Sequence, residues 1–210
     1  MSDDAGLQIT RPRVVLATRN KGKIEELRRI LADVIDVELV GLEQFPDLPD
    51  VAETGETFVE NALLKARDVS QRTGLPAIAD DSGLCVDHLG GAPGVRSARW
   101  AGEPSDDAKN LARVLEQLAA ATPVERAAHF ACAAVAVVPG KGELVAEGEM
   151  RGHLIDAPRG GGGFGYDPIF VADGYVLTTA EIPADEKDAI SHRGKAFRAL
   201  APLLADLLRD

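Results

Sequence analysis

An unbroken run of apolar residues at 130–138 is the feature that most narrows how this chain can fold. A strand of that composition is buried on both faces, as happens in sheets that carry helices on each side. Shorter, largely apolar stretches at 14–17, 37–40 and 76–79 predict further strands, and residues 144–150 are expected to pair with the central strand as a hairpin.

Between these runs, apolar residues recur at the spacing of amphipathic helices. The positions are Ile24, Leu27 and Leu31; Phe58, Ala62, Ala66 and Val69; Leu111, Val114, Leu115 and Leu118; and Phe197, Leu200, Leu204 and Leu207. Asn20, Ser105 and Ser191 are the expected N-caps, and Pro202 is expected to kink or split the last helix. Alternating strands and helices predict an α/β fold with a mixed sheet, as one domain over residues 13–210 behind a flexible tail at 1–12.

Composition excludes several kinds of partner. Lysine and arginine total 23 against 34 aspartate and glutamate residues, a net charge of −11. Nucleic acids and anionic membranes need a basic face, so neither is expected as a partner. The sequence shows no apolar stretch of membrane-spanning length and an acidic start, which predicts a cytoplasmic protein without a signal peptide. Cys85 and Cys132 have no metal-ligand spacing and are expected to be buried thiols.

Basic residues follow the first predicted strand. Lys21 and Lys23 fall in the first turn of a helix, where the helix dipole disfavours cations. A bound anion such as phosphate would reverse that penalty, and solvated lysines are the alternative.

Carboxylates form two further clusters, Glu53 with Glu56 and Glu60, and Asp80 with Asp81 directly after the 76–79 strand. Adjacent aspartates repel, so a cation such as Mg²⁺ is one explanation for the pair. A solvated turn is the other.

The last two clusters lie near the C-terminus. Four glycines at 160–163 lead into Phe164, which offers a flat stacking face, although a flexible linker is the alternative. Ser191 precedes His192 and Arg193, two donors that can recognise a carbonyl oxygen or simply lie at the surface. We expect all five clusters to lie in loops or at the ends of helices and strands.

In this order, the clusters resemble one family, the non-canonical purine nucleoside triphosphate pyrophosphatases that act on inosine and xanthosine triphosphates. The matching stretches are VVLATRNKGKIEEL at 14–27, ETGETFVENALLKA at 53–66, PAIADDSGLCVDHLGGAPGVRSARWAG at 76–102, GGFGYDPIF at 162–170 and SHRGK at 191–195. The resemblance implies Mg²⁺-dependent cleavage of ITP, dITP and XTP to the monophosphate and pyrophosphate, which removes deaminated purines from the nucleotide pool. It also implies a homodimer, and an elongated mixed β-sheet with flanking helices and two lobes around an active-site cleft.

The resemblance assigns roles to individual residues. Asp81 is the general base, and Glu53 and Asp81 hold the metal. Phe164 stacks on the base, and His192 and Arg193 recognise it. The substrate-binding residues are Thr18, Arg19, Asn20, Lys21, Gly22, Lys23, Ser82, Phe164, Gly165, Tyr166, Asp167, Lys187, His192 and Arg193.

Two alternatives remain open on the sequence. The nearer one is a related nucleotide pyrophosphatase that acts on modified pyrimidines or other nucleotides, and a substrate panel separates it. A non-catalytic nucleotide-sensing module is the other, although Lys23, Glu53 and Asp81 together speak against it.

Overall fold

The computed structural model describes residues 11–32 and 34–209, so most of the expected tail at 1–12 lies outside the described residues. The helices are α1 Lys21–Ala32, α2 Phe58–Thr73, α3 Asp107–Gln117, α4 Ala184–Ile190 and α5 His192–Arg209. The strands are β1 Arg13–Leu16, β2 Glu38–Gly41, β3 Ala77–Val86, β4 Ala127–Val138, β5 Gly142–Leu154 and β6 Phe170–Ala172. Within these ranges, no helix is long and apolar enough to cross a membrane.

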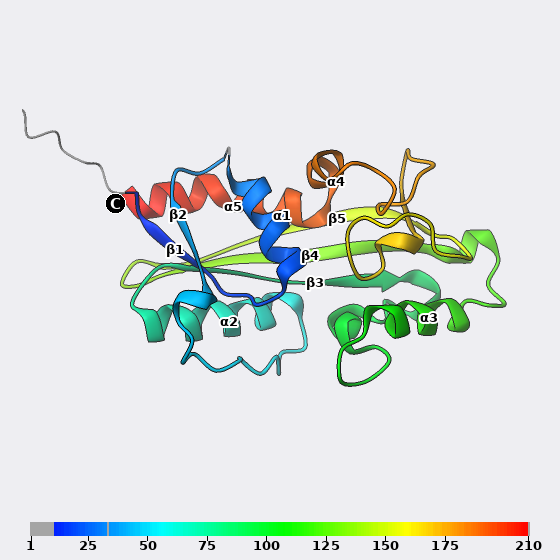
Figure 1. Cartoon of the computed structure of the whole chain (residues 1–210), viewed down its shortest axis with the longest axis horizontal. Coiled ribbons are helices and arrows are strands. Elements are labelled where there is room, and N and C mark those ends of the chain that lie inside the picture. Colours follow the sequence, from blue (N-terminus) through cyan, green and yellow to red (C-terminus); the bar gives the residue numbers. More distant parts are fainter. Residues whose placement is uncertain (1–10, 33, 210) are drawn as a thin grey trace, which may run out of the picture.

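One six-stranded sheet, in the order β2-β1-β3-β4-β5-β6, forms the frame of the molecule. β1 is parallel to β2 and β3, and the β3-β4, β4-β5 and β5-β6 pairs are antiparallel. The long strands β3, β4 and β5 run along the longest axis (Figure 1). The predicted mixed α/β sheet is therefore confirmed.

The apolar run at 130–138 lies in β4, and both faces of this strand are covered as predicted. On one face, Cys132 and Ala134 join a core with Phe197 of α5 and Leu27 of α1. On the other face, Val135 packs in a core with residues of α2. Figure 1 shows α1 and α5 above the sheet and α2 and α3 below it.

The same strands extend into a second lobe with its own core. There Leu84 and Val86 of β3 pack with Leu111 and Val114 of α3, and Phe170 of β6 joins them. A cleft between these two halves is lined by residues from both.

One expectation about the carboxylates was wrong. Asp80 and Asp81 do not follow a strand that ends at residue 79, because β3 continues to Val86 with β4 as its antiparallel partner throughout. β1 pairs with β3 only as far as Ile78. Past that point, no strand in the described chain covers this side of β3, and the aspartates lie at an open strand edge.

Two features of the helices also differ from expectation, the cap of α3 and the continuity of α5. Asp106, not Ser105, caps α3, with its carboxylate accepting from the Lys109 N–H, while the Ser105 hydroxyl donates to the Ala98 carbonyl. Pro202 does not split α5, which is one continuous helix. Its buried side chains on either side of Pro202 are packed against the sheet, and they hold the helix together.

Candidate active site

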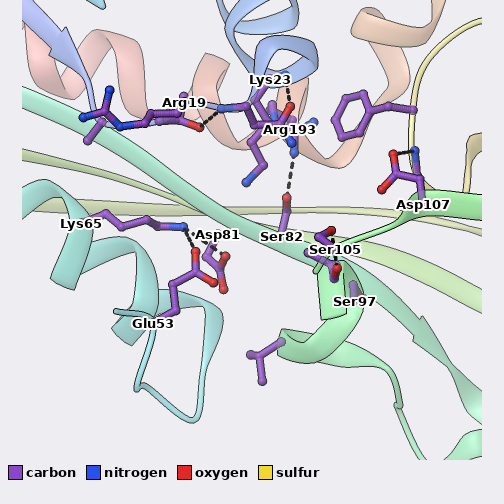
Figure 2. Close-up of a pocket in the computed structure, with 18 of the residues that line it drawn as sticks. Arg19, Lys23, Glu53, Lys65, Asp81, Ser82, Ser97, Ser105, Asp107 and Arg193 are labelled. Atoms are coloured by element: carbon purple, nitrogen blue, oxygen red, sulfur yellow. Dashed lines mark hydrogen bonds and ion pairs between the residues drawn. The ribbon is translucent and has the colours of Figure 1, made fainter. Parts of the chain in front are cut away.

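A cavity of about 560 Å³ opens beside the exposed edge of β3, between the start of α1, the segment before α2 and the loop before β6. Every residue expected at the site lines this cavity except Lys21 and Gly22: the lining includes Thr18, Arg19, Asn20, Lys23, Glu53, Asp81, Ser82, Phe164, Gly165, Tyr166, Asp167, Lys187, His192 and Arg193. Residues far apart in the sequence thus form one site (Figure 2).

The start of α1 forms one wall. The Asn20 side chain accepts a hydrogen bond from the Lys23 N–H at 3.1 Å, so the predicted N-cap is confirmed. The Lys23 ammonium lies 3.0 Å from the buried carboxylate of Asp80. An anion was expected at this helix start, and for Lys23 that anion is the carboxylate of Asp80. Lys21 is exposed and does not line the cavity.

Arg19 binds the segment before α2, unlike its neighbours Asn20 and Lys23. Its guanidinium donates to the Asp50 carboxylate at 2.9 Å and to the Leu48 carbonyl at 2.6 Å. It therefore holds the segment that leads to Glu53 against the start of α1.

Glu53 and Asp81 converge on one cation, the ammonium of Lys65. Lys65 Nζ lies 2.9 Å from Glu53 Oε1 and 3.1 Å from Asp81 Oδ1 (Figure 2). The capping box of Thr57 and Glu60 fixes the start of α2, the helix that carries Lys65. Glu60, one of the clustered carboxylates in the sequence, is therefore a helix cap.

The two adjacent aspartates differ in acidity. Burial opposes the charge of Asp80, but Lys23, Arg193 and Lys65 outweigh it and hold the pKa of this carboxyl far below its ordinary value. Burial raises the pKa of Asp81, against the opposing pull of Lys65 and Lys23. Environments that separate the pKa values of neighbouring carboxyls are typical of acid–base sites. Asp80 is thus a permanent anion, and Asp81 is the group suited to accept a proton.

The donor set suits the Mg²⁺ that the resemblance implies. Mg²⁺ typically takes one or two protein carboxylates and completes its shell with water and substrate phosphates. Glu53 and Asp81 supply two carboxylate oxygens directed at one point, where the Lys65 ammonium is a stand-in cation. In the described ranges, no group of three or more His, Cys, Asp or Glu side chains forms a metal site of protein ligands alone.

The glycine-rich loop places Phe164 over the start of α1. A β-carbon added to Gly22 would lie 2.7 Å from the Phe164 ring, so only glycine leaves room for this aromatic side chain. The Gly165 N–H donates to Asp107 at 2.9 Å, and the Tyr166 hydroxyl donates to the Ser97 carbonyl at 2.8 Å. The loop is therefore anchored across the cleft, unlike a flexible linker.

A buried network of charged side chains holds the loop of Phe164 in place. Glu26 accepts from Lys187 at 2.7 Å and from Arg193. Lys187 also donates to Asp167, whose carboxylate accepts the Phe164 N–H at 2.9 Å. Arg193 donates to Asp80 at 3.2 Å. Charged side chains therefore connect the loop of Phe164 to the aspartates on β3.

His192 and Arg193 begin α5, and Ser191 caps this helix as expected by accepting from the Gly194 N–H at 2.9 Å. Both residues are buried rather than at the surface. The His192 ring is stacked on Phe130 with centroids 4.8 Å apart. Burial, reinforced by Arg193 and Lys187, holds the pKa of His192 well below its ordinary value of 6.5.

Sequence reasoning missed two of the charged residues at the site, Lys65 and Glu26. A signal exists for Lys65, since it is four positions after Asn61 on a helix whose neighbouring positions, Ala62 and Ala66, are buried. Asn61 donates to Asp81 at 3.3 Å from the same face. Glu26 precedes the buried Leu27 and gives no such signal, because a lone glutamate on a helix is usually solvated.

Fold and cavity together define an α/β protein with a nucleotide-sized cleft lined by carboxylates and cations that pair with one another. The sequence model of the Ham1 family matches residues 14–203, and the chain belongs to this family.

Relatives and solved structures agree with that assignment. A Streptomyces coelicolor protein named dITP/XTP pyrophosphatase is 58% identical over 197 residues, which cover 93% of this chain and 98% of that protein. A Geobacillus kaustophilus protein of the same name is 50% identical and covers 89% of this chain and 91% of its own length. The structure of a HAM1 protein from Coxiella burnetii superposes with a TM-score of 0.83 at 42% identity, covering 93% of this chain and 99% of that one.

Proposed function

We propose that this chain hydrolyses dITP, ITP and XTP to the nucleoside monophosphate and pyrophosphate. The observation that carries the proposal is the convergence of Asp81, Glu53, Lys23 and Phe164 on one cavity, in a chain whose relatives are named dITP/XTP pyrophosphatase. Cleansing of the nucleotide pool follows, because deaminated purines are destroyed before a polymerase incorporates them.

The triphosphate is bound at the start of α1. Backbone N–H groups and the positive end of a helix dipole favour an anion there, and Lys23 adds a charge that is only 14% exposed. Lys65 faces the same cavity from α2. These groups place positive charge at the cavity of a protein whose net charge is −11.

Asp81 acts as the base. Its raised pKa and its position at the open edge of β3 suit a carboxylate that orients a water molecule toward the α-phosphorus and removes its proton. Glu53 and Asp81 are the residues that would hold Mg²⁺. When bound, Mg²⁺ neutralises charge on the phosphate oxygens and stabilises pyrophosphate as a leaving group.

We assign base selection to the part of the same cavity that Phe164, His192 and Arg193 line. Phe164 stacks on any purine, and His192 and Arg193 are donors that suit the 6-oxygen of hypoxanthine and xanthine but oppose the 6-amino group of adenine. GTP shares the 6-oxygen, so its exclusion needs a further contact at its 2-amino group.

A substrate panel tests the proposal. Pyrophosphate release is measured for dITP, ITP, XTP, GTP and ATP with Mg²⁺, with and without EDTA. We expect the first three to exceed ATP by about 10²–10⁴ in kcat/KM, and EDTA to stop turnover. Asp81→Asn is expected to lower kcat by about 10²–10⁴ while Asp87→Asn, an exposed aspartate after β3, keeps normal turnover. Equal rates on all five nucleotides would overturn the proposal.

The proposal includes a cytoplasmic homodimer. The family resemblance supports the dimer, and the free, buried Cys85 and Cys132 suit a reducing compartment. Light scattering coupled to gel filtration checks the dimer, and a mass of 22.2 kDa would contradict it.

A further inference from the structure

Lys65 occupies the position between the two carboxylates that the proposed function gives to the metal. Its ammonium contacts one oxygen of Glu53 at 2.9 Å and one oxygen of Asp81 at 3.1 Å. The remaining oxygens have partners as well, since Arg99 lies 3.5 Å from Glu53 Oε2 and the Asn61 amide donates to Asp81 Oδ2 at 3.3 Å. Each of the four carboxylate oxygens therefore has a partner within the chain.

We propose that Lys65 is a resident counter-ion that keeps divalent metal off the free enzyme and releases Glu53 and Asp81 when the metal arrives with the nucleotide. This inference rests on the proposed function for the identity of the metal. It adds an order of events, in which metal enters the site with the nucleotide and does not bind stably before it.

The geometry makes the two cations mutually exclusive. Mg²⁺ held by Glu53 Oε1 and Asp81 Oδ1 would take the two oxygens that Lys65 Nζ contacts at 2.9 and 3.1 Å, so the two cations would compete for them. The Lys65 side chain is only 14% exposed, so water screens the repulsion between the two cations weakly. Lys65 must therefore move before a metal is held by both carboxylates.

The nucleotide supplies a place for the displaced ammonium. Lys65 lines the same cavity as Lys23 and Asn20 at the start of α1, where the triphosphate is proposed to bind. A flexible four-carbon stem lets the ammonium exchange two carboxylate oxygens for phosphate oxygens while α2 stays fixed by its capping box. In this exchange a divalent ion would replace the monovalent ammonium between the carboxylates, and the negative phosphates would match the charge of Lys65.

A simpler role for Lys65 makes the opposite prediction. If the ammonium only ties the segment before α2 to β3, its removal lets Glu53 and Asp81 drift apart. Metal affinity would then fall or stay the same. If Lys65 is a competitor, its removal raises metal affinity.

The test measures metal binding to the full chain without nucleotide, so it is independent of turnover. Mn²⁺, which takes the same oxygen ligands as Mg²⁺, is titrated and followed by electron paramagnetic resonance. Lys65→Met keeps an unbranched side chain one atom shorter and removes its charge, and we expect it to bind Mn²⁺ about tenfold more tightly than the wild type. Lys65→Gln is the second variant if Lys65→Met fails to fold.

Two controls locate the effect. Lys109→Met removes an exposed charge on α3, and we expect it to leave Mn²⁺ affinity unchanged. The double variant Glu53→Gln/Lys65→Met is expected to lose the gain, because one of the two ligands is gone. Unchanged or weaker binding by Lys65→Met, or an equal gain in Lys109→Met, would overturn the inference. If Lys65→Met binds Mn²⁺ more tightly but the substrate panel shows equal rates on all five nucleotides, the proposed activity is rejected. The competition between Lys65 and the metal then still stands.

Discussion

Glu26 and Lys187, 161 positions apart in the chain, form a buried ion pair with 2.7 Å between Oε1 and Nζ. The second oxygen of the same carboxylate accepts from Arg193. A carboxylate on α1 thus fixes two cations that line the cavity beside Phe164, whose ring centroid lies 5.3 Å from Lys187 Nζ. The positions of the Lys187 and Arg193 side chains therefore depend on Glu26, which does not itself line the cavity.

We therefore expect Glu26→Gln to raise KM for ITP and to lower kcat/KM by about 10- to 100-fold, because an amide accepts from one cation and opposes the other. Steady-state kinetics on folded protein measures this change. Glu25→Gln, one position earlier and exposed, is the matched control and should behave as wild type. A Glu26→Gln protein with less folded material but normal KM would show that Glu26 is only structural.

Stability should fall in mild acid because of His192. The pKa of this residue in the folded protein lies well below 6.5, so the folded state resists a proton that the unfolded state accepts. Its contribution to stability is complete above pH 6.5 and is lost, by up to about 1.4 kcal/mol per pH unit, as the pH falls from 6.5 toward the folded pKa. Urea denaturation at pH 7, 6 and 5 measures the slope. His192→Gln should have a flatter slope over this range, and an unchanged slope would assign the effect to other groups.

Lys23→Ala should destabilise the nucleotide-free protein. The sequence alone suggested that a lysine in the first turn of a helix is an unfavourable charge, but Lys23 is the partner of the buried Asp80 at 3.0 Å. We expect a loss of about 1–3 kcal/mol in the free energy of unfolding, together with a lower kcat/KM. Lys21→Ala, in the same turn and exposed, should leave stability unchanged. Equal stability of the Lys23→Ala protein and the wild type in urea would contradict the pairing.

Gly22→Ala should displace Phe164. The new methyl group would lie 2.7 Å from the ring, so the ring must shift away from its stacking position. Because stacking contributes about 1–3 kcal/mol for any base, we expect KM to rise by similar factors for ITP and ATP. The KM values of Gly22→Ala and of the wild type, measured for ITP and for ATP, test this expectation. A rise for ITP alone would mean that Gly22 acts on base recognition and not through the ring.

The elements that depend on local patterns could be predicted from the sequence. The apolar run in β4 indicated a strand covered on both faces, and the spacing in α1 and α2 indicated their buried sides. The course of β3 could not be predicted, because Asp80 and Asp81 look like the polar end of a strand. Their burial is stable only because cations from three helices surround them, and one of these, Arg193, is more than a hundred positions from Asp80 in the chain.

The candidate site divides in the same way. Its loops carry a compact pattern of lysines, carboxylates and glycines, and most of the residues expected from that pattern line the cavity. Glu26 and Lys65 were not predicted as site residues, because charged residues on a helix are usually exposed to solvent. Their function follows from partners that only the folded chain brings within hydrogen-bond distance.

The place of bond cleavage tests the central claim most directly. If Asp81 activates a water molecule that attacks the α-phosphorus, hydrolysis of ITP in ¹⁸O-labelled water puts the label into inosine monophosphate and none into pyrophosphate. Mass spectrometry of the two products, with Mg²⁺ present, measures the label. We predict one ¹⁸O atom per monophosphate released. Label in pyrophosphate, or release of orthophosphate in its place, would contradict the account.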